Sequence, residues 1–342
     1  MDLSVGLVGF GFAGKVFHAP VIRAVDGLCL TTIVQRRGAS DPRHPDVEFV
    51  TSVDALLARA VDLVVIATPN ASHHPIAKQC LLAGRHVVID KPFATTVADA
   101  EELVRLGGER QRVLSVYQNR RYVGDFVTLQ RLLSEGVLGN VTSFESHFDR
   151  FRPQLRPAAW REQALPGSGI WFDLGPHLLD QALVLFGRPL AISADIRIER
   201  EGAAVDDAFD VTLHYAHLRA LLRASMLALA PGPTFAVHGS AGSFVKYGLD
   251  PQEAALRAGR SPREPNWDVE PAEQHGTVTT PDGSRKIPTI PSSFARYYEN
   301  VRDAIHGTAP LAVTAAQALD VMRGLALAAA SSRNRRAQEW TA

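Results

Sequence analysis

The chain has 342 residues, of which 46% are hydrophobic, so it is long enough for two domains with large apolar cores. Its 36 basic residues balance its 36 acidic residues, which argues against a broad electrostatic surface for nucleic acid or an anionic membrane. We see neither a signal peptide nor an uncharged apolar run long enough to span a membrane. We therefore expect a cytoplasmic protein in which Cys29 and Cys80 are buried thiols.

The first apolar run, residues 5–8, leads into Gly9-Phe10-Gly11-Phe12-Ala13-Gly14. This G-x-G-x-x-G spacing is typical of a strand, a tight turn and a helix start that together bind a dinucleotide. Gly9 permits the turn, Gly11 lets the backbone approach the pyrophosphate, and Gly14 lets the helix pack closely on the strand. The N–H groups of the helix start then favour the phosphates. The alternative is a glycine-rich turn without a ligand, but the helix-like residues that follow favour cofactor binding.

Up to about residue 117, short apolar runs alternate with helix-like segments. We expect strands at 3–8, 28–34, 63–68, 86–89 and 112–116, and helices at 14–25, 53–58, 74–83 and 97–107. This alternation predicts a parallel sheet with helices on both faces, a doubly wound Rossmann domain over residues 1–120. Gly84 and Gly107 are expected to end their helices.

The second expected strand ends in Val34-Gln35-Arg36-Arg37, without an acidic residue. A fold that selects NAD usually places Asp or Glu here, against the ribose 2′-hydroxyl. Arg36 and Arg37 instead suit a 2′-phosphate, because a guanidinium binds phosphate through two parallel hydrogen bonds. The alternative is a solvated loop with two surface arginines. We favour NADP as the cofactor and keep NAD as a second candidate.

Two further strand ends carry candidate residues. Thr68-Pro69-Asn70 ends the third strand, where Asn70 offers both donor and acceptor groups to a cofactor, or caps the next helix, or does both. Asp90-Lys91-Pro92 ends the fourth strand. A lysine there points an ammonium into the crevice where doubly wound sheets bind ligands, although most lysines are solvated surface residues.

After residue 117 strand-like runs follow one another. We expect a helix at 125–135, then strands at 141–148, 191–198, 208–215, 220–229, 235–237 and 243–246, and helices at 294–305 and 315–330. Strands in succession predict an α+β domain with a largely antiparallel sheet, which we assign to residues 121–342.

Residues 167–180 of this second domain contain Asp173, His177 and Asp180 at the i, i+4 and i+7 positions of one helix face. Histidine carries protons near neutral pH, and a neighbouring carboxylate can orient it. The alternative is a buried structural histidine with Asp173 as a helix cap. Pro176 either starts the helix beyond Asp173 or kinks it. No third His or Cys stands at ligand spacing, so we expect no metal.

Taken together, the glycine motif, Asp90-Lys91-Pro92 and the Asp173-x-x-x-His177 pair resemble the Gfo/Idh/MocA family of NAD(P)-dependent oxidoreductases, over nearly the whole chain. Residues 144–153 and 237–253 resemble a bacterial subgroup that contains NADP-dependent scyllo-inositol dehydrogenases. The family usually has Glu-Lys-Pro, so Asp90 shortens the acid by one methylene. The resemblance implies that Lys91, Asp173 and His177 are catalytic, and that Trp160 and Arg161 reach the nicotinamide end of the cofactor.

The resemblance also implies reversible oxidation of a secondary alcohol on a cyclic polyol or sugar, by a dehydrogenase whose active site lies between its domains. His177 would move the hydroxyl proton, Lys91 would bind the same oxygen, and Asp173 would orient His177 or bind a neighbouring hydroxyl. The alternatives are a non-catalytic NADP-binding regulator and a redox-neutral glycosidase that uses its nicotinamide transiently. An uncovered sheet face favours a homodimer or homotetramer. The candidates for substrate binding are Asn119, His147, Asp149, Arg150, Arg152, Asp173 and His177.

Overall fold

The structure is a computed structural model that describes residues 2–36, 40–156 and 158–341. The chain forms two compact units, each built from three segments. The first unit contains Met1–Tyr122, Pro251–Asp268 and Ser292–Leu319, and the second contains Val123–Asp250, Val269–Pro291 and Asp320–Ala342. The sequence-based division at residue 120 describes two continuous pieces, whereas here two later segments return to the first unit.

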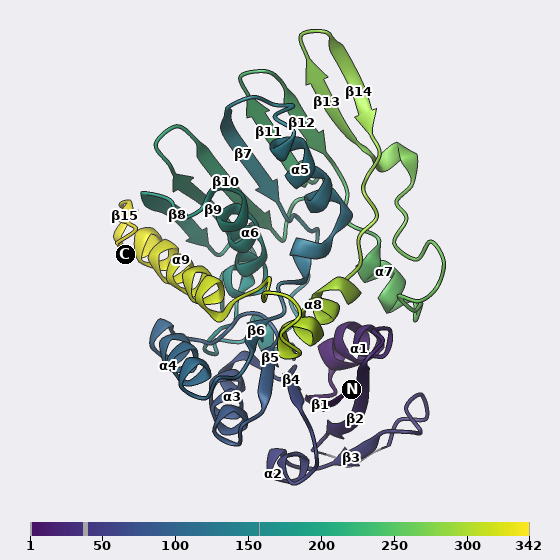
Figure 1. The fold of residues 1–342 in the computed structure, drawn as a ribbon. Helices are drawn as coiled ribbons and strands as arrows, with labels where there is room; N and C mark the ends of the chain where they lie inside the picture. The colour runs from purple at the N-terminus through teal and green to yellow at the C-terminus, as the bar shows by residue number, and fades with distance from the viewer. Residues whose placement is uncertain (1, 37–39, 157, 342) are drawn as a thin grey trace. The chain divides into compact units, whose positions relative to one another are not determined.

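The first unit is built on a six-stranded parallel sheet in the order β3-β2-β1-β4-β5-β6 (Figure 1). This order confirms the doubly wound Rossmann fold. β4, at the centre of the sheet, is apolar and buried along its whole length, as expected for a parallel strand with helices on both faces of the sheet. Its strands are β1 (Leu3–Val8), β2 (Leu28–Val34), β3 (Glu48–Val50), β4 (Leu63–Ile66), β5 (His86–Ile89) and β6 (Leu114–Val116). The sequence analysis missed β3, which has three residues and too short an apolar pattern to detect.

Helices connect these strands, and α3 and α4 pack side by side (Figure 1). Ser52 and Thr96 cap α2 and α4, each accepting a backbone N–H through its side-chain oxygen. The helical segments of this unit are η1 (Gly14–His18), α1 (Ala19–Arg23), α2 (Val53–Leu57), η2 (Asn70–Ser72), α3 (His73–Leu82), α4 (Val97–Glu109), η3 (Asn119–Tyr122), α7 (Gln252–Arg257) and α8 (Ala295–Ile305).

Three local expectations have mixed outcomes. Gly84 follows α3 with φ +75°, as expected of a residue that ends a helix. The expectation for Gly107 is wrong, because α4 continues past it, and a Cβ there would lie 3.3 Å from Leu114 of β6. Gly107 therefore lets the helix approach the sheet. Cys80 is buried, whereas Cys29 is exposed at the beginning of β2, beside Asp2, so the expectation of two buried thiols is wrong for Cys29.

The second unit contains a nine-stranded sheet in the order β14-β13-β12-β11-β7-β10-β9-β8-β15. Only the β10–β7 pair is parallel, so the expectation of a largely antiparallel sheet is confirmed. Its strands are β7 (Val141–His147), β8 (Ala191–Arg197), β9 (Ala208–His214), β10 (Arg219–Ser225), β11 (Phe235–Gly239), β12 (Ser243–Lys246), β13 (Gly276–Thr280), β14 (Gly283–Ile287) and β15 (Gln338–Glu339). The sequence analysis missed the last three, and β14 shows why, because its exposed polar residues carry no alternating apolar pattern.

Three helices lie across one face of this sheet: α5 (Gly124–Ser134), α6 (Ile170–Phe186) and α9 (Ala315–Asn334) (Figure 1). Aromatic side chains join the layers, with Phe126 of α5 against Phe235 and Phe186 of α6 against Phe144. Short helical turns, η4 (Trp160–Glu162) and η5 (Ala272–Gln274), complete the unit.

Across the described ranges, no helix combines the length and the apolar character needed to cross a membrane.

The structure predicts that mild acid destabilises the first unit through two histidines, the half-buried His86 and the buried His44. Nδ1 of His86 accepts the backbone N–H of Val113 at 2.9 Å, which requires that nitrogen to carry no proton. Burial lowers the pKa of His86, with a further contribution from Arg112, and burial also lowers the pKa of His44. The unfolded chain then binds more protons below about pH 6.5, so stability falls as the pH is lowered from there toward the folded-state pKa. Thermal unfolding measured from pH 7.5 to 5.5 should show the melting temperature falling.

The variant His86→Gln should make that fall shallower, because the Gln amide oxygen accepts the same N–H without titrating. His217→Gln, in the exposed turn between β9 and β10, is the matched control and should leave the slope unchanged. A melting temperature independent of pH over this range would contradict the prediction.

Candidate active site

The glycine motif forms a tight turn between β1 and a helical segment that runs from residue 12 to residue 23. Gly9 has φ +98°, and a Cβ there would lie 2.5 Å from the carbonyl oxygen of Ala67. A Cβ on Gly14 would lie 2.2 Å from the carbonyl oxygen of Gly9. Both positions therefore require glycine, one for its backbone conformation and both for the close approach of the main chain.

Gly11 differs from the other two glycines, since no atom of the described residues beyond its chain neighbours lies within 4 Å of the position of its Cβ. The protein itself thus gives no reason for glycine at this position, whereas a pyrophosphate lying against the backbone would. Beside the turn, Phe10 packs edge-on against His44 and Phe49, and Phe12 is half exposed beneath the guanidinium of Arg257. The residues of this turn fit a dinucleotide phosphate group.

The end of β2 presents groups suited to a ribose. Arg36 is exposed in the turn that follows β2, and Arg37 lies outside the described residues. The sequence analysis gave no role to Gln35, whose side-chain Oε1 is buried and has no hydrogen-bond partner among the described residues. An amide oxygen accepts a hydrogen bond from a hydroxyl, so Gln35 is suited to the position that an acid occupies in NAD-binding folds.

The end of β4 carries Thr68, Pro69 and Asn70. Asn70 is buried and is the first residue of η2, and neither η2 nor α3 has a side-chain cap hydrogen bond. The N-cap positions of η2 and α3 are Pro69 and Ser72, so Asn70 occupies neither of them. Ser72 closes the loop instead, since its hydroxyl donates to Pro69 O at 2.7 Å and contacts Thr68 Oγ1 at 2.8 Å.

The end of β5 holds Lys91 in a turn that is fixed by Asp90. Oδ1 of Asp90 accepts the backbone N–H of Lys91 at 2.8 Å, and the Lys91–Pro92 peptide bond is cis. Burial would raise the pKa of Asp90, but His18, Lys91 and His73 outweigh it and lower the pKa to about 2. Nε2 of His18, from the first helical segment, lies 3.8 Å from Oδ2 of Asp90. The carboxylate is therefore ionised at neutral pH and stabilises positive charge on Lys91.

His18 and His73 are two residues that the sequence analysis missed. Both are fully buried in the first unit. Nδ1 of His18 lies 2.6 Å from the hydroxyl of Tyr298, and the His18 ring packs at a tilt against Tyr117, with ring centres 4.5 Å apart. His18 ends a five-residue π-helical turn, a feature often found at functional sites. The sequence of this turn does not distinguish it from an ordinary helix, so it offered no signal for His18.

In the second unit, Asp173 and His177 both lie on α6. Pro176 lies inside this helix, which resolves the alternatives for it in favour of an interior position. His177 and Asp180 are buried, and Asp173 is partly exposed. Spacing alone indicated the shared helix face, and the continuous helix Ile170–Phe186 provides it.

The beginning of α6 is set by Asp206, which the sequence analysis did not consider. Its Oδ2 accepts the backbone N–H of Trp171 at 2.7 Å, and its carbonyl oxygen accepts the N–H of Ile170 at 2.9 Å. A Cβ on Gly169, which has φ +88°, would lie 2.2 Å from Oδ1 of Asp206. The helix therefore begins before Asp173, and Asp173 lies in its first turn.

Asp173 is held between two arginines. Its Oδ1 lies 3.2 Å from Nε of Arg161, and its Oδ2 lies 3.6 Å from Nη1 of Arg150. The Arg161 guanidinium also stacks on Trp160, 4.6 Å from the ring centre. The structure thus brings Asp173 together with the expected Trp160–Arg161 pair and with Arg150.

The other substrate candidates lie elsewhere. Asn119 begins η3 in the first unit, and Arg152 follows β7, where its backbone N–H bonds to Met226 O. His147 lies on the sheet face opposite α6, because Phe144 faces that helix and side chains alternate along β7. Asp149 follows on the same face, 3.4 Å from Nδ1 of His147. Within the second unit, His147 and Asp149 therefore lie on the sheet face away from α6.

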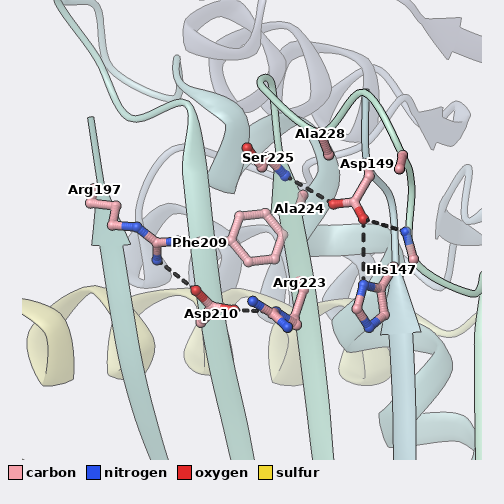
Figure 2. A pocket seen from close by; sticks show the side chains of 11 residues that line it. His147, Asp149, Arg197, Phe209, Asp210, Arg223, Ala224, Ser225 and Ala228 are labelled. Carbon is pink, nitrogen blue, oxygen red and sulfur yellow. Dashed lines mark hydrogen bonds and ion pairs between the residues drawn. The ribbon is translucent and has the colours of Figure 1, made fainter. Parts of the chain in front are cut away.

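His147 and Asp149 line a cavity of about 290 Å³ on that open face (Figure 2). Arg197 and Arg223 both pair with Asp210 in this cavity, and Asp149 accepts the backbone N–H groups of Ser225 and Gly232. These charged groups therefore already have partners within the sheet, and the cavity presents none that points to a ligand. Within the described residues, no group of three or more His, Cys, Asp or Glu side chains could hold a metal ion.

Comparison with known proteins places both units. Residues 3–118 match the oxidoreductase family model for an NAD-binding Rossmann fold, and residues 130–340 match the model for the C-terminal alpha/beta domain of the same family. The chain belongs to the Gfo/Idh/MocA family of oxidoreductases. The resemblance stated from the sequence is confirmed, and with it the expectation of an oxidoreductase with a nicotinamide cofactor.

Several relatives align with nearly the whole chain. The chain is 45% identical to the uncharacterized oxidoreductase YdgJ of Escherichia coli, over 98% of this chain and 97% of that protein. It is 38% identical to the NADP(+) scyllo-inositol 2-dehydrogenase IolW of Bacillus subtilis, over 98% and 95%. Among solved structures, the oxidoreductase yvaA of Bacillus subtilis superposes with a TM-score of 0.94 at 35% identity, covering 99% of each chain.

Replacement of single glycines should separate folding from cofactor binding. Gly14→Ala places a methyl group against Gly9 O and should destabilise the protein by about 1–3 kcal/mol. Gly11→Ala meets no protein atom, so its melting temperature should stay near that of the wild type. The same methyl group would enter the space of a pyrophosphate and should weaken NADP binding about tenfold or more. Calorimetric titration and thermal unfolding measure both effects, and normal NADP affinity in Gly11→Ala would contradict the assignment.

Proposed function

We propose that this protein is an NADP-dependent dehydrogenase that transfers hydride between the cofactor and a secondary alcohol or ketone of a cyclic polyol or sugar, with scyllo-inositol as a candidate. The observation that carries the proposal is the fixed turn at the carboxyl end of β5, where an ionised Asp90 lies beside Lys91. Ligands of doubly wound sheets bind at the carboxyl ends of the strands. The name of the relative IolW supports the substrate class and the choice of NADP.

The bound cofactor supplies the hydride acceptor for oxidation and the hydride donor for reduction. The protein binds and orients the substrate and moves one proton. Lys91 donates a hydrogen bond to the reacting oxygen and stabilises its negative charge. His177 accepts the hydroxyl proton during oxidation and returns it during reduction.

Of the two roles expected for Asp173, orienting His177 or binding a neighbouring hydroxyl, we favour the second. Two arginines already lie against its carboxylate. In this proposal it fixes Arg150 and Arg161 and offers its remaining acceptor capacity to a substrate hydroxyl. In this proposal Asp173 is a positioning group and no proton carrier, because each of its carboxylate oxygens lies against a guanidinium.

The cofactor preference depends on the loop after β2. Replacing both Arg36 and Arg37 by Gln should weaken NADP binding by about 1.5–3 kcal/mol for each charge-assisted hydrogen bond lost, and should leave NAD binding nearly unchanged. Titration of both cofactors into the wild type and the double variant measures this. Wild-type preference for NAD, or an equal loss for both cofactors, would show that these arginines do not bind a 2′-phosphate.

The catalytic roles are tested with a substrate found by screening inositol isomers and aldoses for net NADP reduction. Net reduction also separates a dehydrogenase from a redox-neutral glycosidase. Lys91→Ala and His177→Ala should each lower turnover by about 10²–10⁴-fold while NADP still binds. Asp173→Asn should lower turnover by more than the loss of an orienting hydrogen bond alone would, because the neutral amide cannot balance the charges of both arginines.

Near-normal turnover in His177→Ala would remove the proposed proton path. Loss of NADP binding in Lys91→Ala would make that lysine a cofactor ligand.

A further inference from the structure

Beyond the carboxyl ends of β4 and β5, the hydrogen bonds of the sheet no longer join the two segments of backbone. The last hydrogen bond between the two strands runs from Asp90 N to Ile66 O at 2.8 Å. Beyond it the chains separate into the Thr68–Asn70 loop and the Asp90–Pro92 turn. Buried carbonyl oxygens there require donors from another part of the chain.

His73, the first residue of α3, provides that connection. Its Nε2 lies 2.9 Å from the carbonyl oxygen of Thr68, and its Nδ1 lies 2.8 Å from the carbonyl oxygen of Pro92. The side chain is fully buried, whereas its contact with Thr68 O is only partly buried. Both partners are carbonyl oxygens, so a neutral ring donates to one of them and only an imidazolium donates to both. One imidazole ring therefore lies between the candidate cofactor loop and the turn that carries Lys91.

The result is that Lys91 is held on both sides along the chain. On one side Asp90 is fixed by Ile66 O and contacts His18, and on the other side Pro92 O contacts His73. A displacement of about 1 Å of a reacting group can lower a rate by about 100-fold, so this anchoring matters for turnover.

We propose that His73 is a positioning residue for the reaction: it clamps the Lys91 turn to the cofactor loop through the carbonyl oxygens of Pro92 and Thr68. This inference rests on the proposed function of Lys91. It assigns a role to a residue that touches neither substrate nor cofactor and acts through the two segments that it joins.

Two conservative variants separate the two halves of the clamp. The amide nitrogen of Asn extends about as far as Nδ1 of His, and that of Gln about as far as Nε2. His73→Asn therefore keeps the donor to Pro92 O and loses the contact with Thr68 O, while His73→Gln does the reverse. His74→Ala is the matched control, because the neighbouring His74 is partly exposed and pairs with Glu102 at the surface.

Hydrogen exchange in the protein without substrate or cofactor measures the clamp directly. In His73→Gln, protection of a peptide covering residues 90–94 should fall, whereas His73→Asn should keep it and lose protection around residues 68–72. His74→Ala should match the wild type. Equal exchange in the Asn and Gln variants would overturn the proposal without reference to catalysis.

Turnover then measures the consequence. His73→Gln should lower kcat about 10- to 100-fold with little change in NADP affinity, and His73→Asn should chiefly weaken NADP binding. His73→Gln should add little further loss in a Lys91→Ala background, because both changes act through the same lysine. Losses that multiply in the double variant would overturn the proposal, since they would show a general structural effect.

The two failures are distinguishable. Normal turnover in Lys91→Ala would refute the proposed function of Lys91, and the catalytic part of this inference with it, while the exchange result would still stand. Impaired turnover in Lys91→Ala together with multiplicative losses would refute the role of His73 alone.

Discussion

The close approach of the first helical segment to the end of β1 is the constraint on which the first unit depends. With no side chain on Gly9 or Gly14, the backbone of the helix start reaches the carbonyl of Gly9, and the turn packs against Ala67 after β4. The helix then carries His18 into the interior, where it meets Tyr298 and Asp90. The absence of side chains on Gly9 and Gly14 therefore shapes the candidate phosphate site and also places His18 next to Asp90 of the candidate catalytic turn.

Charge is organised differently in the two units. In the first unit, Asp90 is an ionised carboxylate in a buried environment, stabilised by two histidines and a lysine. In the second, Asp173 is partly exposed and lies between two guanidiniums. An isolated buried carboxylate would take up a proton, so Asp90 depends on its cationic neighbours to stay charged. The substitution of Asp for the Glu usual in the family at position 90 fits this arrangement, because the shorter side chain still bonds to the Lys91 N–H.

Side chains alternate along the strands of the nine-stranded sheet, so mainly apolar residues face the helices and mainly polar residues lie on the open face. Along β7, Phe144 and Ser146 face the helices while Glu145 and His147 face away. The charged side chains of the open face pair across neighbouring strands, as Arg223 does with Asp210. His147 and Asp149 belong to this network, on the sheet face away from α6.

The sequence by itself determined the Rossmann fold, the family and the residues of the glycine turn, because these depend on local spacing and on steric rules that act within a few residues. It also indicated Lys91 and the Asp173–His177 face, since strand ends and helix periodicity are local patterns. Three features follow from the folded chain alone: Asp173 pairs with Arg150 and Arg161, Asp206 starts α6, and His73 joins two loops. Arg150 lies 23 positions from Asp173 along the chain and Asp206 lies 35 from Trp171. No local pattern encodes such pairs, because the free energy that selects them comes from burial and backbone hydrogen bonding, which exist only once the chain has folded.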